Sequence, residues 1–300
     1  MDAAALRAVF PREYLHQFYT NSRRPDGREL TACRNLSVSF DNISHAFGSC
    51  MVRMGETSAV AGISGTVEVR KEQVEEDSII PRMQTEESAA KRRKTEEEKE
   101  TEPVIDVVVE YTSLCSPDVV VGKNNQSSQE QTIILKSLIE GGHFVDLSGL
   151  KVKGEVKRDG RRFGVWKLKL DVYPLNDAGN VTDAVLMAAI GAIKSAKLPA
   201  FTIDKENKVV YDESKTTCID VLSLPTPLTV GRFEKYYVPD CNKEEEGQLS
   251  STTTVVMGDK QLILKLHRQG GDQVTLAEMK KMVAMSALRR DAILAAFKHH

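Results

Sequence analysis

The chain has 300 residues, of which 41% are hydrophobic, and its 41 basic residues nearly balance its 43 acidic residues, for a formal net charge of −2. This composition is typical of a globular protein with a substantial core, and the balanced charge excludes a global positive field, so any RNA contact must come from a local basic patch. No run approaches the roughly 20 apolar residues of a membrane-spanning helix, and residues 1–19 lack the apolar core of a secretory signal. We therefore expect no membrane partner.

Cysteine and histidine usage argues against disulfides and metals. The five cysteines are scattered without a C-x-x-C pair, and the six histidines show no metal-ligand spacing. Such an odd, scattered set favours reduced thiols in an intracellular compartment. We expect neither a metal nor another cofactor.

The chain opens with an amphipathic helix and a charged turn. Apolar side chains recur at every fourth position of residues 3–19, a helical spacing that Pro11 interrupts. Residues 25–27, Pro-Asp-Gly, predict a turn, because proline presets φ and glycine accepts a positive φ. Three arginines flank this turn and either grip a phosphate of RNA or form an ordinary solvated surface: Arg23, Arg24 and Arg28.

Short strands follow, and then a segment without fold signals. Polar turns separate antiparallel strands that are predicted at residues 36–40, 49–54 and 58–64. Residues 71–103 are dense in charge and lack aromatic side chains, so they cannot bury enough apolar surface to offset their chain entropy. We predict a disordered insert there. Within it, Lys91-Arg92-Arg93-Lys94 is either a nuclear-import signal or a solvated patch.

Order returns after the insert. Residues 104–110 predict a strand that is a candidate to pair with residues 58–64 across the insert. A helix with Ser127 or Ser128 as its N-cap is expected to extend to Ile139. Gly141-Gly142 ends this helix, and further strands are predicted near residues 144–153 and 162–172.

The centre of the chain predicts a strand, a polar turn and a buried helix. Residues 165–172 alternate apolar with charged side chains, as a strand with one buried face requires. Residues 176–180 supply a polar turn. Residues 184–193 carry no charge on any side, so the helix they predict must lie between layers.

The second half repeats the order of strands followed by a long helix. Strands are predicted at residues 209–211, 219–222, 228–232 and 236–238, and a hairpin of residues 252–257 and 261–267 around Gly258-Asp259. Thr275 and Glu278 predict a capping box before the last helix. The buried stripe of that helix is expected at Leu276, Met279, Val283, Ala287 and Leu294. Arg290 lies close to this stripe, and the sequence offers no partner for it. The whole chain is thus expected to be α+β, with mixed sheets packed with long helices.

Four segments occur in the same order as in RNase PH-like proteins: RRPDGRE, LNDAGNVTDAVLMAAIGAI, VPDCNKEEE and the terminal hairpin before Gly270-Gly271. The sequence resembles this family over nearly the whole chain outside residues 71–103, and is most similar to the non-catalytic ring subunits of the eukaryotic RNA exosome. The resemblance implies the RNase PH-like fold, of the ribosomal protein S5 domain 2-like type. It implies one domain over residues 1–300, made of two βα halves, with residues 200–300 as the C-terminal half.

The resemblance also bears on catalysis. Active members of the family degrade RNA from its 3′ end by phosphorolysis, so arginines and a helix N-terminus must hold phosphate, and a carboxylate must supply a proton or hold a metal. Active members resemble Asp-Gly-Gly-Thr-Arg-Thr at the central turn, whereas this chain has Val181 in place of the arginine and an extra charge at Asp183 that would repel phosphate. They also resemble Leu-Ile-Gly-Arg-Ser-Leu-Arg after the preceding helix, where Gly141 and Phe144 replace the two arginines.

We therefore interpret the site around Asp177, Val181, Asp183, Gly141 and Phe144 as degenerate, and the chain as not an enzyme. Asp177 itself is expected to be a turn residue that bonds its own backbone. The alternative is an active phosphate-dependent 3′-to-5′ exoribonuclease that uses Asp171 and Asp177. A third possibility is a stand-alone RNA-binding protein.

The leading hypothesis is a structural subunit of the exosome ring that supports 3′-to-5′ RNA processing and degradation, including rRNA maturation and mRNA turnover. Other ring subunits, cap subunits and single-stranded RNA would be its partners, in the nucleus and nucleolus and also in the cytoplasm. Besides the arginines of the early turn, four basic residues either line an RNA path or form a solvated hairpin tip: Lys157, Arg158, Arg161 and Arg162.

Overall fold

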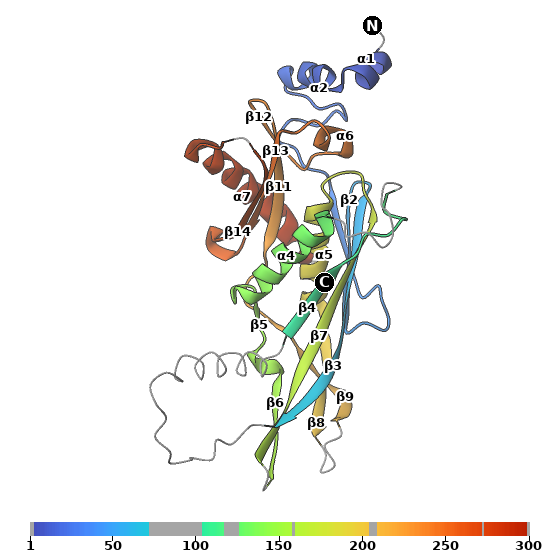
Figure 1. Ribbon diagram of the computed structural model, residues 1–300, viewed down its shortest axis with the longest axis vertical. Coiled ribbons are helices and arrows are strands. Elements are labelled where there is room, and N and C mark those ends of the chain that lie inside the picture. The colour runs from blue at the N-terminus through green and yellow to red at the C-terminus, as the bar shows by residue number, and fades with distance from the viewer. Residues whose placement is uncertain are drawn as a thin grey trace, which may run out of the picture.

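The computed structural model describes residues 3–71, 104–116, 126–157, 160–203, 209–271 and 273–298. Over these ranges the protein is α+β, with two main sheets and helices between and around them (Figure 1). The fold class expected from the sequence is therefore confirmed. The predicted insert at 71–103, with the basic run at 91–94, lies outside the described residues except for Lys71.

The larger sheet has the strand order β1-β2-β3-β7-β4, and β6 also pairs with β7. The pairs are antiparallel except for β4 with β7, which is parallel. Its strands are β1 (Leu36–Phe40), β2 (Gly48–Met54), β3 (Thr57–Lys71), β4 (Val104–Val109), β6 (Lys151–Lys157) and β7 (Gly160–Asn176).

The smaller sheet has the antiparallel order β12-β11-β13-β14. Its strands are β11 (Thr226–Phe233), β12 (Tyr236–Pro239), β13 (Ser251–Met257) and β14 (Ile263–Gly270). The predicted hairpin around Gly258-Asp259 is confirmed as β13–β14, joined through the 3-10 turn η2 (Asp259–Gln261). Two short pairs complete the strands of the described residues: β8 (Lys197–Ile203) with β9 (Val209–Cys218), and β5 (Val145–Asp146) with β10 (Asp220–Val221).

The described helices are α1 (Ala3–Val9), α2 (Pro11–Thr20), α4 (Gln126–Glu140), α5 (Val181–Ser195), α6 (Lys243–Glu246) and α7 (Leu276–Lys298), with a 3-10 turn η1 (Ser148–Leu150). Pro11 interrupts the N-terminal helix as predicted, and it becomes the first residue of α2, where a missing N–H does no harm. The prediction of Ser127 or Ser128 as an N-cap is wrong, because both lie inside α4. The Ser128 hydroxyl instead donates to the carbonyl oxygen of Val109 and so ties α4 to β4.

β7 is the strand around which the larger sheet is built. Its apolar alternation is confirmed, since Trp166, Leu168, Leu170 and Val172 are all buried. The suggested pairing of the 104–110 strand with residues 58–64 is wrong, because β2 and β7 already occupy the two edges of β3. β4 pairs with the free edge of β7 instead.

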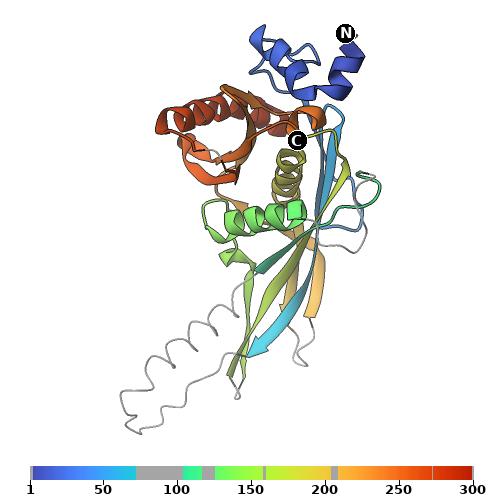
Figure 2. The ribbon, with the colours of Figure 1, turned by 45° about the horizontal axis from the view of Figure 1, so that its top comes forward.

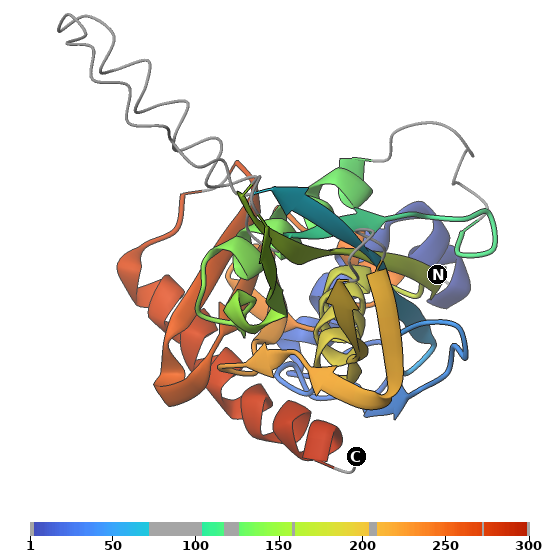
Figure 3. The same cartoon turned by 90° about the horizontal axis from the view of Figure 1, so that it is seen from below.

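α5 lies between the two sheets, as its uniformly apolar sequence predicts. It packs against β2, β3 and β7 on one side and against β11 on the other (Figure 2). Seen from below, it runs through the middle of the molecule while α7 lies along the outside (Figure 3). The backbone at Gly191 approaches β2 so closely that an added Cβ would lie 2.8 Å from the Cβ of Cys50.

The predicted buried stripe of the last helix is wrong by about one position. The buried residues of α7 are Met282, Ser286, Ile293 and Phe297, whereas Leu276 is largely exposed. Alanine and methionine occur on every side of this helix, so spacing alone could not select the face that meets β11, β13 and β1. The capping box of Thr275 and Glu278 is confirmed by hydrogen bonds in both directions.

Arg290 of α7 has a partner that the sequence did not suggest. It is ion-paired with Asp259 of η2, with 2.5 Å between Arg290 Nη2 and Asp259 Oδ1. The contact joins the last helix to the connection between β13 and β14.

We expect Gly191→Ala to lower the melting temperature. Overpacking against Cys50 costs about 1 to 3 kcal/mol, which exceeds the gain of about 1 kcal/mol from the higher helix propensity of alanine. Gly271→Ala is the matched control, since its added Cβ would meet nothing within 4 Å. Equal melting temperatures for the two variants in a thermal denaturation series would contradict the close packing of α5.

Candidate functional site

The turn between β7 and α5 is held by its own carboxylate. Asp177 Oδ1 accepts a hydrogen bond of 3.1 Å from the backbone N–H of Gly179, as expected of an aspartate in a turn. Gly179 has φ +91°, and an added Cβ there would collide with the backbone of Asn242. Asn180 follows in the left-handed region with φ 54°. The turn that would carry catalysis in an active relative is therefore packed directly against the segment before α6.

α6 is one turn long and begins with a complete capping box. The side chain of Asn242 accepts from the N–H of Glu245, and the carboxylate of Glu245 accepts from the N–H of Asn242. The next residue, Glu246, extends toward α5, where its Oε1 accepts a 2.6 Å hydrogen bond from the backbone N–H of Asn180. A carboxylate of the chain itself thus lies where the N-terminal end of α5 would attract an anion.

Arg24 lies in the interior beside α6. Its side chain is ion-paired with Glu245, and neither side chain is exposed. It also donates to the carbonyl oxygens of Ala32, Pro239 and Asp240 at 2.9 to 3.2 Å. The prediction that Arg24 binds RNA is therefore corrected: its nitrogens already have partners inside the protein, and RNA cannot reach them.

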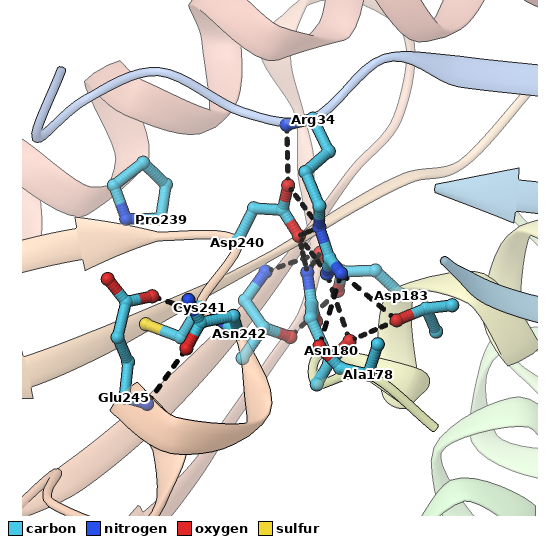
Figure 4. A network of polar contacts seen from close by, with 12 residues as sticks. Arg34, Ala178, Asn180, Asp183, Pro239, Asp240, Cys241, Asn242 and Glu245 are labelled. Carbon is cyan, nitrogen blue, oxygen red and sulfur yellow. Dashed lines mark hydrogen bonds and ion pairs between the residues drawn. The ribbon is translucent and has the colours of Figure 1, made fainter. Parts of the chain in front are cut away.

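Asp240 is the centre of a second ionic cluster (Figure 4). Arg34 donates to it from its backbone N–H and from two guanidinium nitrogens, with the shortest contact at 2.6 Å. Arg28 lies 3.3 Å away, and the amide of Asn180 donates to it at 3.0 Å. Although burial opposes ionisation, the hydrogen bonds and the charge of Arg34, with the hydrogen bond from Asn180, together outweigh it and lower the pKa of Asp240 to about 2. Asp240 is therefore ionised at neutral pH.

Asp183, in the first turn of α5, points inward. Its carboxylate accepts from the Asn180 amide at 2.8 Å, from the Thr229 N–H at 2.9 Å and from the Thr229 hydroxyl at 2.7 Å. Burial raises its pKa. The residue that the sequence marks as an extra charge thus ties α5 to β11 of the smaller sheet.

Burial also raises the pKa of Glu246, to about 7. Asp177 adds to this rise, and the nearby cations Lys243 and Arg34 oppose it. Lys243 is itself ion-paired with Asp177. The carboxyl groups of Asp177 and Glu246 therefore both have partners within the protein.

The structure separates two of the predicted site residues from the others. Gln131, near the start of α4, reaches Thr182 of α5 at 3.2 Å, while Gly141 follows the other end of α4, about 15 Å further along the helix axis. Phe144 is buried in the main core next to β5. Gly141 and Phe144 therefore do not belong to the site at α5, because α4 carries them away from it. Val181 is buried at the start of α5, beside Asp177 and Asp183.

The carboxylate pair of the alternative hypothesis is not assembled either. Asp171 lies five residues before the end of β7, roughly 17 Å along the strand. It is paired with Lys169 at 2.9 Å, on the face of the sheet opposite to the buried Leu170 and Val172. Asp171 and Asp177 therefore cannot act together on one reacting group.

The remaining predicted RNA-binding residues occupy different surroundings. Arg23 is exposed, and its backbone bridges to Glu29. Arg28 is mostly covered and is paired with Asp26 and Asp240. Arg158 lies outside the described residues, and Lys157, Arg161 and Arg162 lie in the β6–β7 hairpin with their side chains undescribed.

No group of histidine, cysteine, aspartate and glutamate that could hold a metal occurs among the described residues. None of the described helices is long and apolar enough to cross a membrane.

Sequence reasoning missed Arg34, Asn180 and Glu246. The signal for the last was present, because Asn242 and Glu245 have the spacing of a capping box and fix a helix that presents Glu246. Arg34 stands alone between predicted elements, and no local pattern marks it.

Comparison with known proteins identifies the family of the chain. Residues 32–199 match domain 1 of the 3′ exoribonuclease family, RNase PH, and residues 223–287 match domain 2. The chain belongs to the RNase PH family. The predicted family resemblance is therefore confirmed.

Individual members of the RNase PH family extend the match. Exosome complex component Rrp42 of Aeropyrum pernix is 24% identical over 282 residues, which cover 93% of this chain and 90% of that protein. Exosome complex component Rrp43 of Schizosaccharomyces pombe is 22% identical over 288 residues, which cover 93% and 92%. The four motifs also favour a particular similarity to ribosomal RNA-processing protein 43, and the fission-yeast protein of that name is among the relatives.

The fold is shared with a solved structure described as the Archaeoglobus fulgidus exosome with RNA bound to the active site. The TM-score is 0.69 at 24% identity, with 96% of this chain and 95% of that chain covered. The RNase PH-like fold that the resemblance implied is therefore confirmed.

We expect Arg24→Met to destabilise the protein by about 3 to 5 kcal/mol, because it leaves the buried carboxylate of Glu245 unpaired. Arg23→Met, at the exposed neighbour, is the control, with a change within about 0.5 kcal/mol. Urea denaturation measures both. A loss for Arg24→Met no larger than that for Arg23→Met would show that the buried ion pair does not hold the N-terminal segment.

The low pKa of Asp240 predicts how the stability of the protein depends on pH in acid. Its pKa in the folded protein, about 2, lies below the ordinary value of 3.8, so the ionised carboxylate stabilises the fold above about pH 4, and this contribution disappears as the pH falls through about 2. Asp240→Asn should lose on the order of 2 kcal/mol at neutral pH, and its difference from the wild type should shrink in acid. Urea denaturation at a series of pH values measures this. A difference that stays constant with pH would contradict it.

Proposed function

We propose that this chain is a non-catalytic structural subunit of an RNA exosome ring, which supports 3′-to-5′ processing and degradation of RNA, including rRNA maturation and mRNA turnover. Its membership of the RNase PH family supports this, as do relatives that are exosome complex components and match it over more than nine-tenths of its length. The exosome structure with the same fold supports it as well.

We base the absence of phosphorolysis on one observation: the side chain of Glu246 accepts a hydrogen bond from the backbone N–H of Asn180. A phosphate at the N-terminal end of α5 would have to displace this carboxylate and lie beside Asp177, with Val181 where the family places an arginine. The repulsion between a phosphate and the carboxylate of Asp177 would be strong where water is excluded. Asp177 is also occupied, by its own turn and by Lys243.

Exposed apolar side chains support a place among neighbouring subunits. Several large apolar residues are more than half exposed: Leu114, Ile133, Leu222, Leu276 and Leu288. Interfaces of permanent complexes bury apolar side chains, so these five residues are candidates for contact with neighbouring subunits. Other ring subunits and cap subunits would be the partners.

Single-stranded RNA would contact basic residues through its phosphates. Arg23 at the exposed turn and the residues of the β6–β7 hairpin, Lys157, Arg158, Arg161 and Arg162, are the candidates. Arg28 could contribute only from its exposed margin, since most of its guanidinium is covered. We propose a location in the nucleus and nucleolus and also in the cytoplasm.

The decisive experiment incubates the purified chain with oligo(A) and inorganic phosphate and measures nucleoside diphosphate by chromatography. We expect no release above buffer, because the phosphate position is filled from within. An active RNase PH in the same buffer is the positive control. Phosphate-dependent shortening of RNA that disappears in Asp177→Asn would overturn the non-catalytic assignment.

Assembly is tested by purifying the complex through this subunit from its own cells. We expect ring and cap subunits to co-elute with it in constant proportion. A monodisperse monomer that shifts single-stranded RNA alone would favour the stand-alone RNA-binding protein.

A further inference from the structure

α6 presents two consecutive glutamates to two different parts of the chain. Glu245 reaches the N-terminal segment, where it is ion-paired with the buried Arg24. Glu246 reaches α5 and accepts the hydrogen bond from Asn180. The backbone N–H of Lys243 also donates a hydrogen bond of 3.1 Å to the carbonyl oxygen of Ala178, in the turn before α5. Since α6 is only one turn long, these contacts, together with the ion pairs of Lys243 with Asp177 and of Glu244 with Arg7, hold it in place.

The charged and titratable groups that face Glu246 come from several parts of the chain: Lys243 of α6, Asp177 of the turn after β7, Arg34 before β1, Tyr111 after β4 and Cys241 before α6. The two cations are shared with other acids, since Lys243 is paired with Asp177 and Arg34 with Asp240. Ionised Glu246 therefore competes with these acids for positive charge and is repelled by Asp177.

The ionisation of this cluster changes near neutral pH at one carboxylate. Burial raises the pKa of Glu246 to about 7, in spite of the hydrogen bond from Asn180. Burial also raises the pKa values of Tyr111 and Cys241, so both stay neutral. Asp240, with its pKa of about 2, stays ionised.

We propose that Glu246 is a proton-operated clasp between α6 and the N-terminal end of α5. The protonated side chain accepts the hydrogen bond from Asn180 without bringing charge into the interior, and the clasp is closed. The ionised side chain is poorly hydrated and lies beside Asp177, so α6 opens more often as the pH rises. Because Glu245 binds Arg24 from the same turn, opening of α6 also loosens the N-terminal segment.

Hydrogen–deuterium exchange of the full chain, followed by mass spectrometry, tests the clasp at about pH 6 and about pH 8. Between these values the ionised fraction of Glu246 rises from about one-tenth to about nine-tenths. Glu246→Gln keeps the hydrogen-bond acceptor but cannot ionise, and exchange in this variant at each pH serves as the reference for the intrinsic rate. Over residues 240–248 and 177–182, we expect the ratio of wild-type exchange to this reference to increase up to roughly tenfold between pH 6 and pH 8.

Glu244→Gln is the matched control, because Glu244 lies on the same turn, is half-exposed and is paired with Arg7. It should keep the wild-type response to pH. Glu246→Ala removes the acceptor and should exchange quickly at both pH values, and if it fails to fold, the comparison with Glu246→Gln still decides. A rise in exchange that is the same in the wild type and in Glu246→Gln would overturn the proposal.

The clasp and the proposed function fail in different experiments. Exchange is measured without RNA and without phosphate, so it reports on the clasp alone. Release of nucleoside diphosphate reports on catalysis and leaves the exchange result unchanged.

Discussion

The backbone donors at the N-terminal end of α5 must be satisfied inside the protein, because every residue of this helix except Thr182 and Lys194 is buried between two sheets. That end of a helix attracts anions. In this chain the position is filled from within, since the side chain of Glu246 of α6 accepts the hydrogen bond from the N–H of Asn180. The turn after β7, α6 and β11 are all arranged around this one end, which makes it the point at which the two halves of the chain meet.

Ion pairs between residues far apart in the sequence fix the same region. Arg24 and Glu245 are separated by 221 positions, and Arg34 and Asp240 by 206. The early arginine turn and the late acidic segment of the RNase PH pattern therefore act here as the two sides of one structural contact. Replacing one side leaves a buried charge on the other, so the two segments depend on each other.

The strongest periodic patterns of the sequence predicted the elements of the fold. The partner of each strand and the buried face of the last helix could be identified only from the structure. The alternation in β7 predicts a strand with one buried face, and the uncharged run in α5 predicts a buried helix. Both predictions rest on the high free-energy cost of burying a charge. The partner of β4 could not be predicted, since a period of two describes the faces of a strand and says nothing of its edges. The buried face of α7 could not be chosen for a related reason, as alanine fits either environment.

The candidate site was predicted in part. The turn at Asp177 and the first turn of α5 were recognised, because local residue types define them. The roles of Arg24 and Arg28 were not, since a charge on a turn looks the same in sequence whether it faces solvent or a carboxylate more than 200 positions away. Gly141 and Phe144 were assigned to the site from motif order, which does not record where a helix such as α4 ends.

The parallel pairing of β4 with β7 has a consequence for the integrity of the chain. β3 and β4 lie on the two sides of β7, with Lys71 opposite Arg162 and Val104 opposite Lys167 (Figure 1). A protease that cut the backbone anywhere between Lys71 and Val104 would leave one new terminus beyond β3 and the other before β4. Both of these strands are hydrogen-bonded to β7. The two fragments would then migrate together on a native gel and part only in denaturant.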